Sequence, residues 1–140
     1  MSGRAGYLLD TNILSETRKK KPDAGVMAFL HSVDASAMYL SVLTLGEFRK
    51  GVEAKRGNDA EAAERLAGWV DGLEAGFADR ILDIDLAVAR LWGEWCADRS
   101  RSTVDTLLAA TSVRNDLTLV TRNVCDVEGL PLTVLNPWQK

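Results

Sequence analysis

The sequence predicts an α/β fold, in which helices cover both faces of a mainly parallel sheet. Three observations support this prediction. Short apolar runs alternate with longer segments whose apolar residues recur at helical spacing. Parallel strands need crossover connections, which helices supply, so this alternation favours a parallel sheet. A length of 140 residues with 46% hydrophobic content suits one domain, residues 1–140, with a substantial core.

Five short segments are predicted strands. The first, residues 7–9, is apolar and ends abruptly at the carboxylate of Asp10, as expected of a buried strand that delivers a polar group to a sheet edge. Residues 117–121 give the strongest signal among the others, because leucine and valine alternate with threonine there. The remaining predicted strands cover residues 38–40, 80–84 and 132–135.

Six segments are predicted helices, each introduced by a residue suited to cap a first turn. In the first helix either Asn12 or Ser15 can be the cap, and the helix ends in the basic run before Pro22. The fifth begins at Asp85 and fades at 98–101. The other four cover residues 23–33, 42–55, 60–74 and 102–116, the second of them capped by Ser41.

Composition excludes several classes of site. Cys96 and Cys125 lie far apart without a CxxC spacing, and His31 is the only histidine. Two such thiols and one histidine argue against a structural zinc site and against nucleophilic catalysis by serine or cysteine. Any catalysis must therefore depend on carboxylates.

The hydropathy pattern and the net charge predict a cytoplasmic protein without a general affinity for nucleic acid. No apolar run approaches the roughly 18 residues that span a bilayer, and the polar segment before Tyr7 is too short for a signal peptide. The net charge is −3. The basic run 18–21 can still contact a polyanion locally, although a solvated helix end explains it equally well.

Four acidic residues occupy positions where α/β folds commonly place functional side chains. Asp10 ends a strand, Asp105 lies in the first turn of a helix, Asp126 follows a strand, and Glu47 lies on a helix. Mg²⁺ and Mn²⁺ prefer oxygen ligands, and clustered carboxylates repel one another without a cation. We therefore predict a divalent metal site. Because the chain has 20 acidic residues, solvation of its surface is the alternative, above all for Glu47.

Five motifs in order along the chain resemble those of the PIN-domain ribonucleases. They are residues 8–12 (LLDTN), 40–47 (LSVLTLGE), 105–111 (DTLLAAT), 120–126 (VTRNVCD) and 134–138 (VLNPW). Each motif alone is weak, but five at family-like separations are specific. The resemblance is closest to the VapC and FitB branch, the toxins of type II toxin–antitoxin pairs.

The resemblance implies a three-layer α/β/α fold around a five-stranded sheet. It also implies an endoribonuclease that uses Mg²⁺ or Mn²⁺ to hydrolyse single-stranded or loop RNA. The expected partners are a second copy of the chain and a cognate antitoxin, whose basic side chain enters the acidic site.

The site residues carry over one by one. Asp10, Glu47 and Asp105 match the three most characteristic acids of the family. Asn123 stands where many relatives have an aspartate, and Asp126 is the nearest carboxylate. The four acids are the predicted catalytic residues, and together with Asn123 they are the predicted metal ligands.

Small polar and basic residues complete the predicted site. Thr11, Asn12 and Thr121 are placed to orient the carboxylates or metal-bound water, although Asn12 can instead cap the first helix. The predicted RNA contacts are Arg122, Arg18 and Lys19.

Two other functions stay open on the sequence. A non-catalytic module that binds RNA or protein is compatible with the departure at Asn123. A phosphatase of the haloacid dehalogenase type also begins with a strand that ends in aspartate, but it needs a second aspartate where this chain has Asn12.

Overall fold

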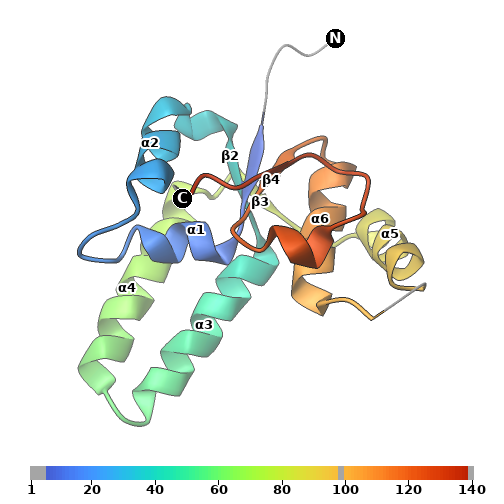
Figure 1. Cartoon of the computed structure of the whole chain (residues 1–140). Coiled ribbons are helices and arrows are strands. Elements are labelled where there is room, and N and C mark those ends of the chain that lie inside the picture. Colours follow the sequence, from blue (N-terminus) through green and yellow to red (C-terminus); the bar gives the residue numbers. More distant parts are fainter. Residues whose placement is uncertain (1–5, 98–99, 139–140) are drawn as a thin grey trace.

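The structure, a computed structural model, describes residues 6–97 and 100–138. Within these residues, strands form a parallel sheet in the order β3-β2-β1-β4-β5 (Figure 1). The strands are β1 (Tyr7–Leu9), β2 (Met38–Ser41), β3 (Ile81–Leu82), β4 (Thr118–Val120) and β5 (Val134–Leu135). The predicted five-stranded parallel sheet is therefore confirmed.

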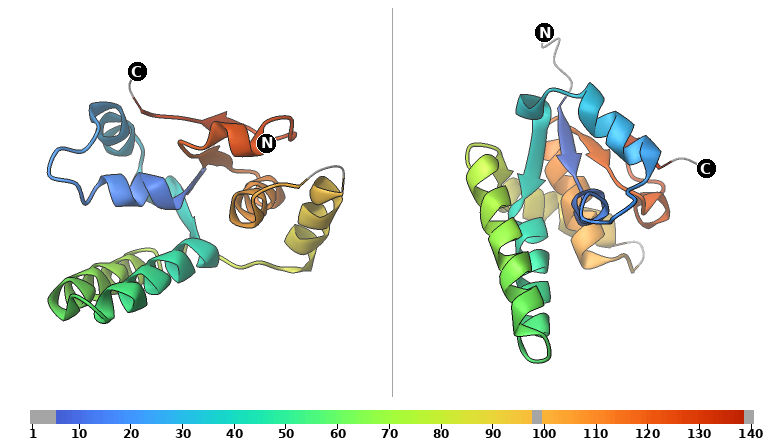
Figure 2. Two further views of the ribbon diagram at one scale, coloured as in Figure 1. Left: turned by 60° about the horizontal axis from the view of Figure 1, so that its bottom comes forward. Right: turned by 90° about the vertical axis from the view of Figure 1, so that its left-hand side faces the viewer.

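Helices cover both faces of this sheet (Figure 2). Successive residues of a strand point to opposite faces, and β1 follows this rule. Leu9 packs with residues of α1 to α4, such as Val26 and Val70, whereas Leu8 packs with Leu108 of α6. The helices are α1 (Thr11–Glu16), α2 (Ala24–Ser32), α3 (Val42–Arg56), α4 (Ala60–Gly76), α5 (Leu86–Cys96) and α6 (Thr103–Arg114), with 3₁₀ turns η1 (Ala35–Ala37) and η2 (Val124–Val127). The molecule thus has the predicted three layers.

Most helices start where the sequence predicts. The side chains of Ser41, Asp85 and Ser102 accept backbone N–H groups in the first turns of α3, α5 and α6. Each satisfies a donor that has no partner within its own helix. The caps predicted at Ser41 and Asp85 are confirmed, and of the two candidates for the start of α6, Ser102 or Thr103, Ser102 is the cap.

The first helix differs from its prediction. Asp10 is its cap, so neither Asn12 nor Ser15 has that role, and α1 ends at Glu16, well before Pro22. The reason is local, since Asp10 follows β1 directly and is itself a strong capping residue. The candidate metal ligand of β1 is thus also the residue that starts α1.

The edge strand β3 is shorter than predicted. Only Ile81 and Leu82 pair with β2, although the prediction covered residues 80–84. An edge strand has a neighbour on one side only, which limits the pairs that it can form. Arg80 still contacts β2, because its carbonyl accepts the Leu40 N–H at 3.0 Å. The predicted fade of α5 at 98–101 falls partly outside the described residues, and α5 ends at Cys96.

The chain order reverses at β1, which has β2 and β3 on one side and β4 and β5 on the other. Ligands of open α/β sheets bind at the carboxyl ends of strands beside such a switch point. The backbone N–H of Asp10 donates to the carbonyl of Val120 at 3.0 Å, which joins the carboxyl ends of β1 and β4. Among the described residues, no helix combines the length and apolar character needed to cross a membrane.

Candidate metal centre

Asp10 lies at the switch point and is buried, with 4% of its surface exposed. Its Oδ1 accepts the Thr11 backbone N–H at 2.6 Å, and its Oδ2 accepts the Thr121 hydroxyl at 2.7 Å. The side-chain amide of Asn12 also donates to Oδ2, at 3.3 Å. Burial is the main cause that raises the pKa of Asp10, with the charges of Glu47 and Asp126 acting in the same direction and the threonine hydrogen bonds opposing it. These hydrogen bonds fix the orientation of the carboxylate, and no cation in the described part of the chain forms an ion pair with it.

Glu47 reaches the same edge from α3. Its Oε1 accepts the Thr11 hydroxyl at 2.6 Å, and the Thr11 oxygen lies 3.4 Å from the hydroxyl oxygen of Thr44, which is buried. Thr11 therefore links the start of α1 to α3 and directs the Glu47 carboxylate. The charge of Glu47 contributes to the raised pKa of Asp10, so the two acids interact.

Asp105 and Asp126 lie close together at the same edge. Burial is the largest cause that raises the pKa of Asp105, to about 6. A hydrogen bond with the Asp126 side chain and the charges of Asp10 and Asp126 raise it too, and a hydrogen bond from Ser102 opposes them. The charges of other acids thus act on both Asp10 and Asp105. The structure brings all four predicted acids together.

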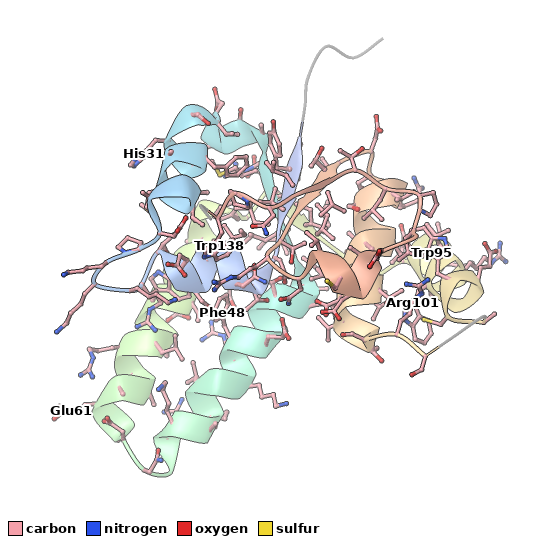
Figure 3. All side chains as sticks on the ribbon, viewed as in Figure 1. His31, Phe48, Glu61, Trp95, Arg101 and Trp138 are labelled. Carbon is pink, nitrogen blue, oxygen red and sulfur yellow. The ribbon has the colours of Figure 1, made fainter. Side chains whose placement is uncertain are left out.

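Arg101 supports the part of the site that carries Asp105. Its Nε donates to the backbone carbonyl of Trp95 at 3.2 Å, and its Nη1 donates to the carbonyl of Glu128 at 3.3 Å (Figure 3). One guanidinium therefore joins the end of α5 to the residue that follows η2. This bridge positions the start of α6, and with it Asp105, relative to Asp126.

The donors suit a hydrated cation. In the described parts of the chain, no three Asp, Glu, His or Cys side chains are grouped so that they could hold a metal ion by themselves. Mg²⁺ usually binds through one or two carboxylates and keeps several waters, so it does not need such a set. No ion pair within the described residues involves Asp10 or Asp105, and burial is the largest cause that raises the pKa of each. The residues fit Mg²⁺ or Mn²⁺ held by carboxylates and water.

Arg122 and Asn123 follow β4 at the rim of the site. The Asn123 backbone N–H donates to the Thr121 hydroxyl oxygen at 3.0 Å, and the Arg122 N–H donates to the side-chain oxygen of Asn12 at 3.4 Å. The Arg122 guanidinium stacks on the ring of Trp138, with its central carbon 5.0 Å from the ring centroid. Trp138 therefore restrains an exposed cation that follows β4 directly after Thr121.

The other predicted RNA contacts have partners within the chain. The Arg18 guanidinium lies over Trp69, with its central carbon 5.1 Å from the ring centroid. Lys19 forms an ion pair with Glu16 at 2.9 Å. Neither interaction connects these cations to the acidic edge, and their contact with RNA stays a prediction.

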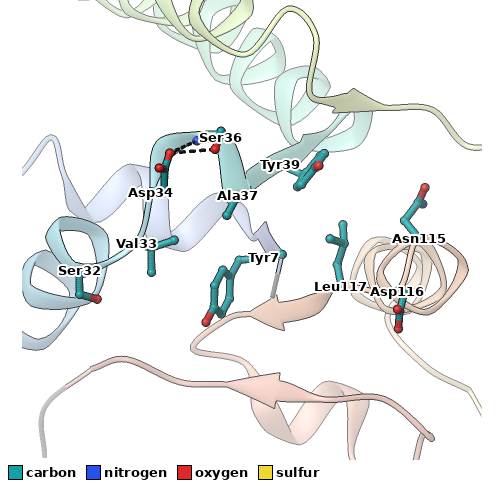
Figure 4. Close-up of a pocket in the computed structure, with 11 residues that line it drawn as sticks. Tyr7, Ser32, Val33, Asp34, Ser36, Ala37, Tyr39, Asn115, Asp116 and Leu117 are labelled. Carbon is teal, nitrogen blue, oxygen red and sulfur yellow. Dashed lines mark hydrogen bonds between the residues drawn. The ribbon is translucent and has the colours of Figure 1, made fainter. Parts of the chain in front are cut away.

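A pocket of about 690 Å³ lies at the opposite edge of the sheet, by the amino ends of the strands (Figure 4). Tyr7, Tyr39, Asp34 and Asp116 are among its lining residues, but none of the predicted site residues is. The acids with raised pKa values lie at the carboxyl edge, so the candidate chemistry belongs there.

Comparison with known proteins decides the family. The sequence profile of the PIN domain matches residues 7–124. The chain belongs to the PIN-domain family. This confirms the resemblance seen in the sequence, and the acidic edge is the carboxyl edge of a PIN fold.

Individual relatives extend this PIN assignment over nearly the whole chain. The VapC ribonuclease Y4jK of Sinorhizobium fredii is 32% identical, with 94% of this chain and 97% of that protein covered. Toxin FitB of Neisseria gonorrhoeae is 33% identical, with 94% and 97% covered. The crystal structure of FitAcB from the same organism superposes with a TM-score of 0.85 at 29% identity, covering 96% of this chain and 99% of that one.

Three residues that contact the candidate site are not among the predicted site residues. Thr44 and Ser102 contact Thr11 and Asp105, and Trp138 restrains Arg122. Thr44 lies three positions before Glu47, at the spacing that puts two residues on the same side of a helix, so helical periodicity gives some signal for it. Nothing in the local sequence links Trp138 to Arg122, because their contact depends on the pairing of β4 with β5.

Proposed function

We propose that this PIN-domain chain is a divalent-metal-dependent endoribonuclease and the toxin of a type II toxin–antitoxin pair. The main support is the burial of Asp10 at the switch point. The charges of Glu47 and Asp126 help to raise the pKa of Asp10, and the charges of Asp10 and Asp126 help to raise the pKa of Asp105. The names of the relatives add to it, since proteins 32% and 33% identical over nearly their full lengths are called a VapC ribonuclease and a toxin.

Each group of the site has a part in phosphodiester hydrolysis. Asp10, Glu47 and Asp105 would hold Mg²⁺ or Mn²⁺, and Asn123 and Asp126 would contribute directly or through water. When bound, the cation activates water and offsets the negative charge that develops on the phosphate. Thr11 and Thr121, hydrogen-bonded to Glu47 and Asp10, keep these carboxylates in place.

We further propose a cognate antitoxin, a homodimer, a cytoplasmic location and a substrate of single-stranded or loop RNA. Support for the antitoxin comes from the solved FitAB complex, whose matched chain is 29% identical. A VapBC structure at 22% identity supports the fold alone. The phosphatase alternative loses support, because Asn12 donates a hydrogen bond to Asp10 and cannot supply the acid that such an enzyme needs.

Chelation tests the proposed enzyme directly. We expect the purified chain to cleave single-stranded RNA with Mg²⁺ or Mn²⁺, to stop when EDTA is added, and to recover when the metal is restored. Gel analysis of a labelled RNA measures this. Cleavage that continues in EDTA would contradict metal dependence. An absence of cleavage with either metal would favour the non-catalytic RNA- or protein-binding module.

Replacement of Arg122 tests its contact with phosphate. We expect Arg122→Ala to raise KM for RNA about tenfold with little change in kcat, since a charged hydrogen bond is lost outside the acidic centre. The salt dependence of KM should also weaken, because one cation fewer meets the polyanion. Arg65→Ala, an exposed arginine on α4, is the matched control. An effect of Arg122→Ala on kcat alone would place Arg122 in the chemical step instead.

A further inference from the structure

A groove opens between α3 and α6 beside the acidic edge. Its volume is about 450 Å³, and it is lined by Val42, Leu43, Gly46, Glu47, Lys50 and Val104. The side chains of Val42, Leu43 and Val104 make its walls apolar. Glu47 belongs to the groove and also to the acidic site, and Val104 precedes Asp105 in the chain. The groove is therefore continuous with the proposed reaction centre.

We propose that this groove binds a nucleobase of the substrate RNA, from the nucleotide next to the cleaved phosphodiester. This inference rests on the proposed ribonuclease function and specifies where its substrate lies. Proteins hold single strands by placing bases on apolar surfaces while cations follow the backbone. The groove offers both, with three aliphatic side chains on its walls and Lys50 exposed at its border.

The charges around the groove favour a base over a phosphate inside it. Glu47 is an acid, and a phosphate between it and the aliphatic walls would be repelled and poorly solvated. Lys50 follows Glu47 by one helical turn, and no ion pair within the described residues involves it. Its charge is available to a backbone phosphate while the neighbouring base enters the groove.

Gly46 keeps the groove open. It lies inside α3, where glycine lowers helix stability relative to alanine. A Cβ atom added at Gly46 would meet no atom within 4 Å, so packing within the chain does not require glycine here. Gly51 of the same helix differs, because a Cβ there would contact Leu66 at 3.7 Å. A larger side chain at position 46 is thus expected to fill the groove without disturbing the fold.

The test compares Gly46→Ala and Gly46→Leu with matched changes at Gly68 of α4, which is exposed, equally free of neighbouring atoms and outside the groove. Binding of a fluorescently labelled single-stranded RNA is measured by anisotropy with Mg²⁺, in an Asp10→Asn background that does not cleave it. We expect Gly46→Leu to weaken binding about tenfold, Gly46→Ala to weaken it less, and Gly68→Leu to leave it unchanged.

Two further measurements separate loss of the groove from loss of the fold. The Tm of Gly46→Ala should equal or exceed that of the parent, because alanine favours the helix. In the cleaving protein, Lys50→Ala should raise KM, whereas Lys55→Ala at the end of the same helix should not.

The failures of the two proposals are distinguishable. If the unaltered chain neither binds nor cleaves RNA with Mg²⁺ or Mn²⁺, the ribonuclease proposal and the groove proposal are both overturned. If it cleaves RNA but Gly46→Leu binds as well as the parent, the groove proposal alone is overturned. If Gly46→Leu retains RNA binding but changes the mass measured by light scattering, the groove is instead a contact between two copies.

Discussion

Asp10→Asn is expected to reduce RNA cleavage at least about 100-fold while the protein stays folded. The activity falls because the amide cannot replace the negative charge of a metal ligand. The fold survives because asparagine also caps helices well, and its side-chain oxygen can accept the Thr11 N–H that Asp10 accepts at 2.6 Å. The Thr121 hydroxyl can turn to accept a hydrogen bond from the new amide.

A cap elsewhere provides the matched control. Asp59 caps α4 by accepting the Ala62 N–H at 3.0 Å, and it lies outside the acidic edge. Asp59→Asn makes the same chemical change at the same kind of position, so it should retain full cleavage. Circular dichroism and thermal melting show whether both variants are folded. Full cleavage by a nuclease-free preparation of Asp10→Asn would falsify the site assignment.

The parts of the site that depend on local signals are predictable from the sequence. An apolar strand that ends in Asp10 and a capped helix that carries Asp105 in its first turn both follow from spacing and residue type. The parallel topology then brings the ends of such elements to the same edge. This is why the five-stranded parallel sheet agrees with the prediction and why Asp10 and Asp105 come to the same edge.

Other parts depend on contacts between distant residues and could not be predicted. The Thr11 hydroxyl binds Glu47, 36 positions away, and the side chain of Trp138 stacks on Arg122. These contacts follow from how α3 packs against α1 and from the pairing of β4 with β5. The cap of α1 differs from the prediction for another reason, since the carboxylate of Asp10 both faces the candidate site and caps the helix.

The second large expected effect is on the stability of the metal-free fold, which the clustered acids lower. The pKa of Asp105 rises from 3.8 to about 6, mainly through burial, so the folded state binds its proton more tightly than the unfolded chain does. An acid with a raised pKa destabilises the fold when it is ionised. The penalty from Asp105 is absent below about pH 4, grows as the pH rises towards 6, and is complete above that value.

Asp105→Asn removes this penalty, so the metal-free variant is expected to be more stable than the parent at pH 7.5. Because Asp105 is only half-buried, solvent screening limits the gain to about 1 kcal/mol. The gain should vanish near pH 4, where the parent is protonated. Urea unfolding in EDTA at both pH values measures it, with Glu61→Gln, an exposed change on α4, as the control (Figure 3).

Added Mg²⁺ should reverse the order of stability. A ligand that binds only the folded state stabilises it, and the parent binds the cation more tightly than a variant that lacks one carboxylate. The same Asp105→Asn protein should lose at least about 100-fold in RNA cleavage. We expect the variant to be more stable without metal, less stabilised by Mg²⁺ and inactive. This combination would show that the acids of this edge bind the cation although they lower the stability of the metal-free fold. Equal stability of parent and variant at pH 7.5 in EDTA would instead mean that the ionised carboxylate of Asp105 does not destabilise the metal-free fold.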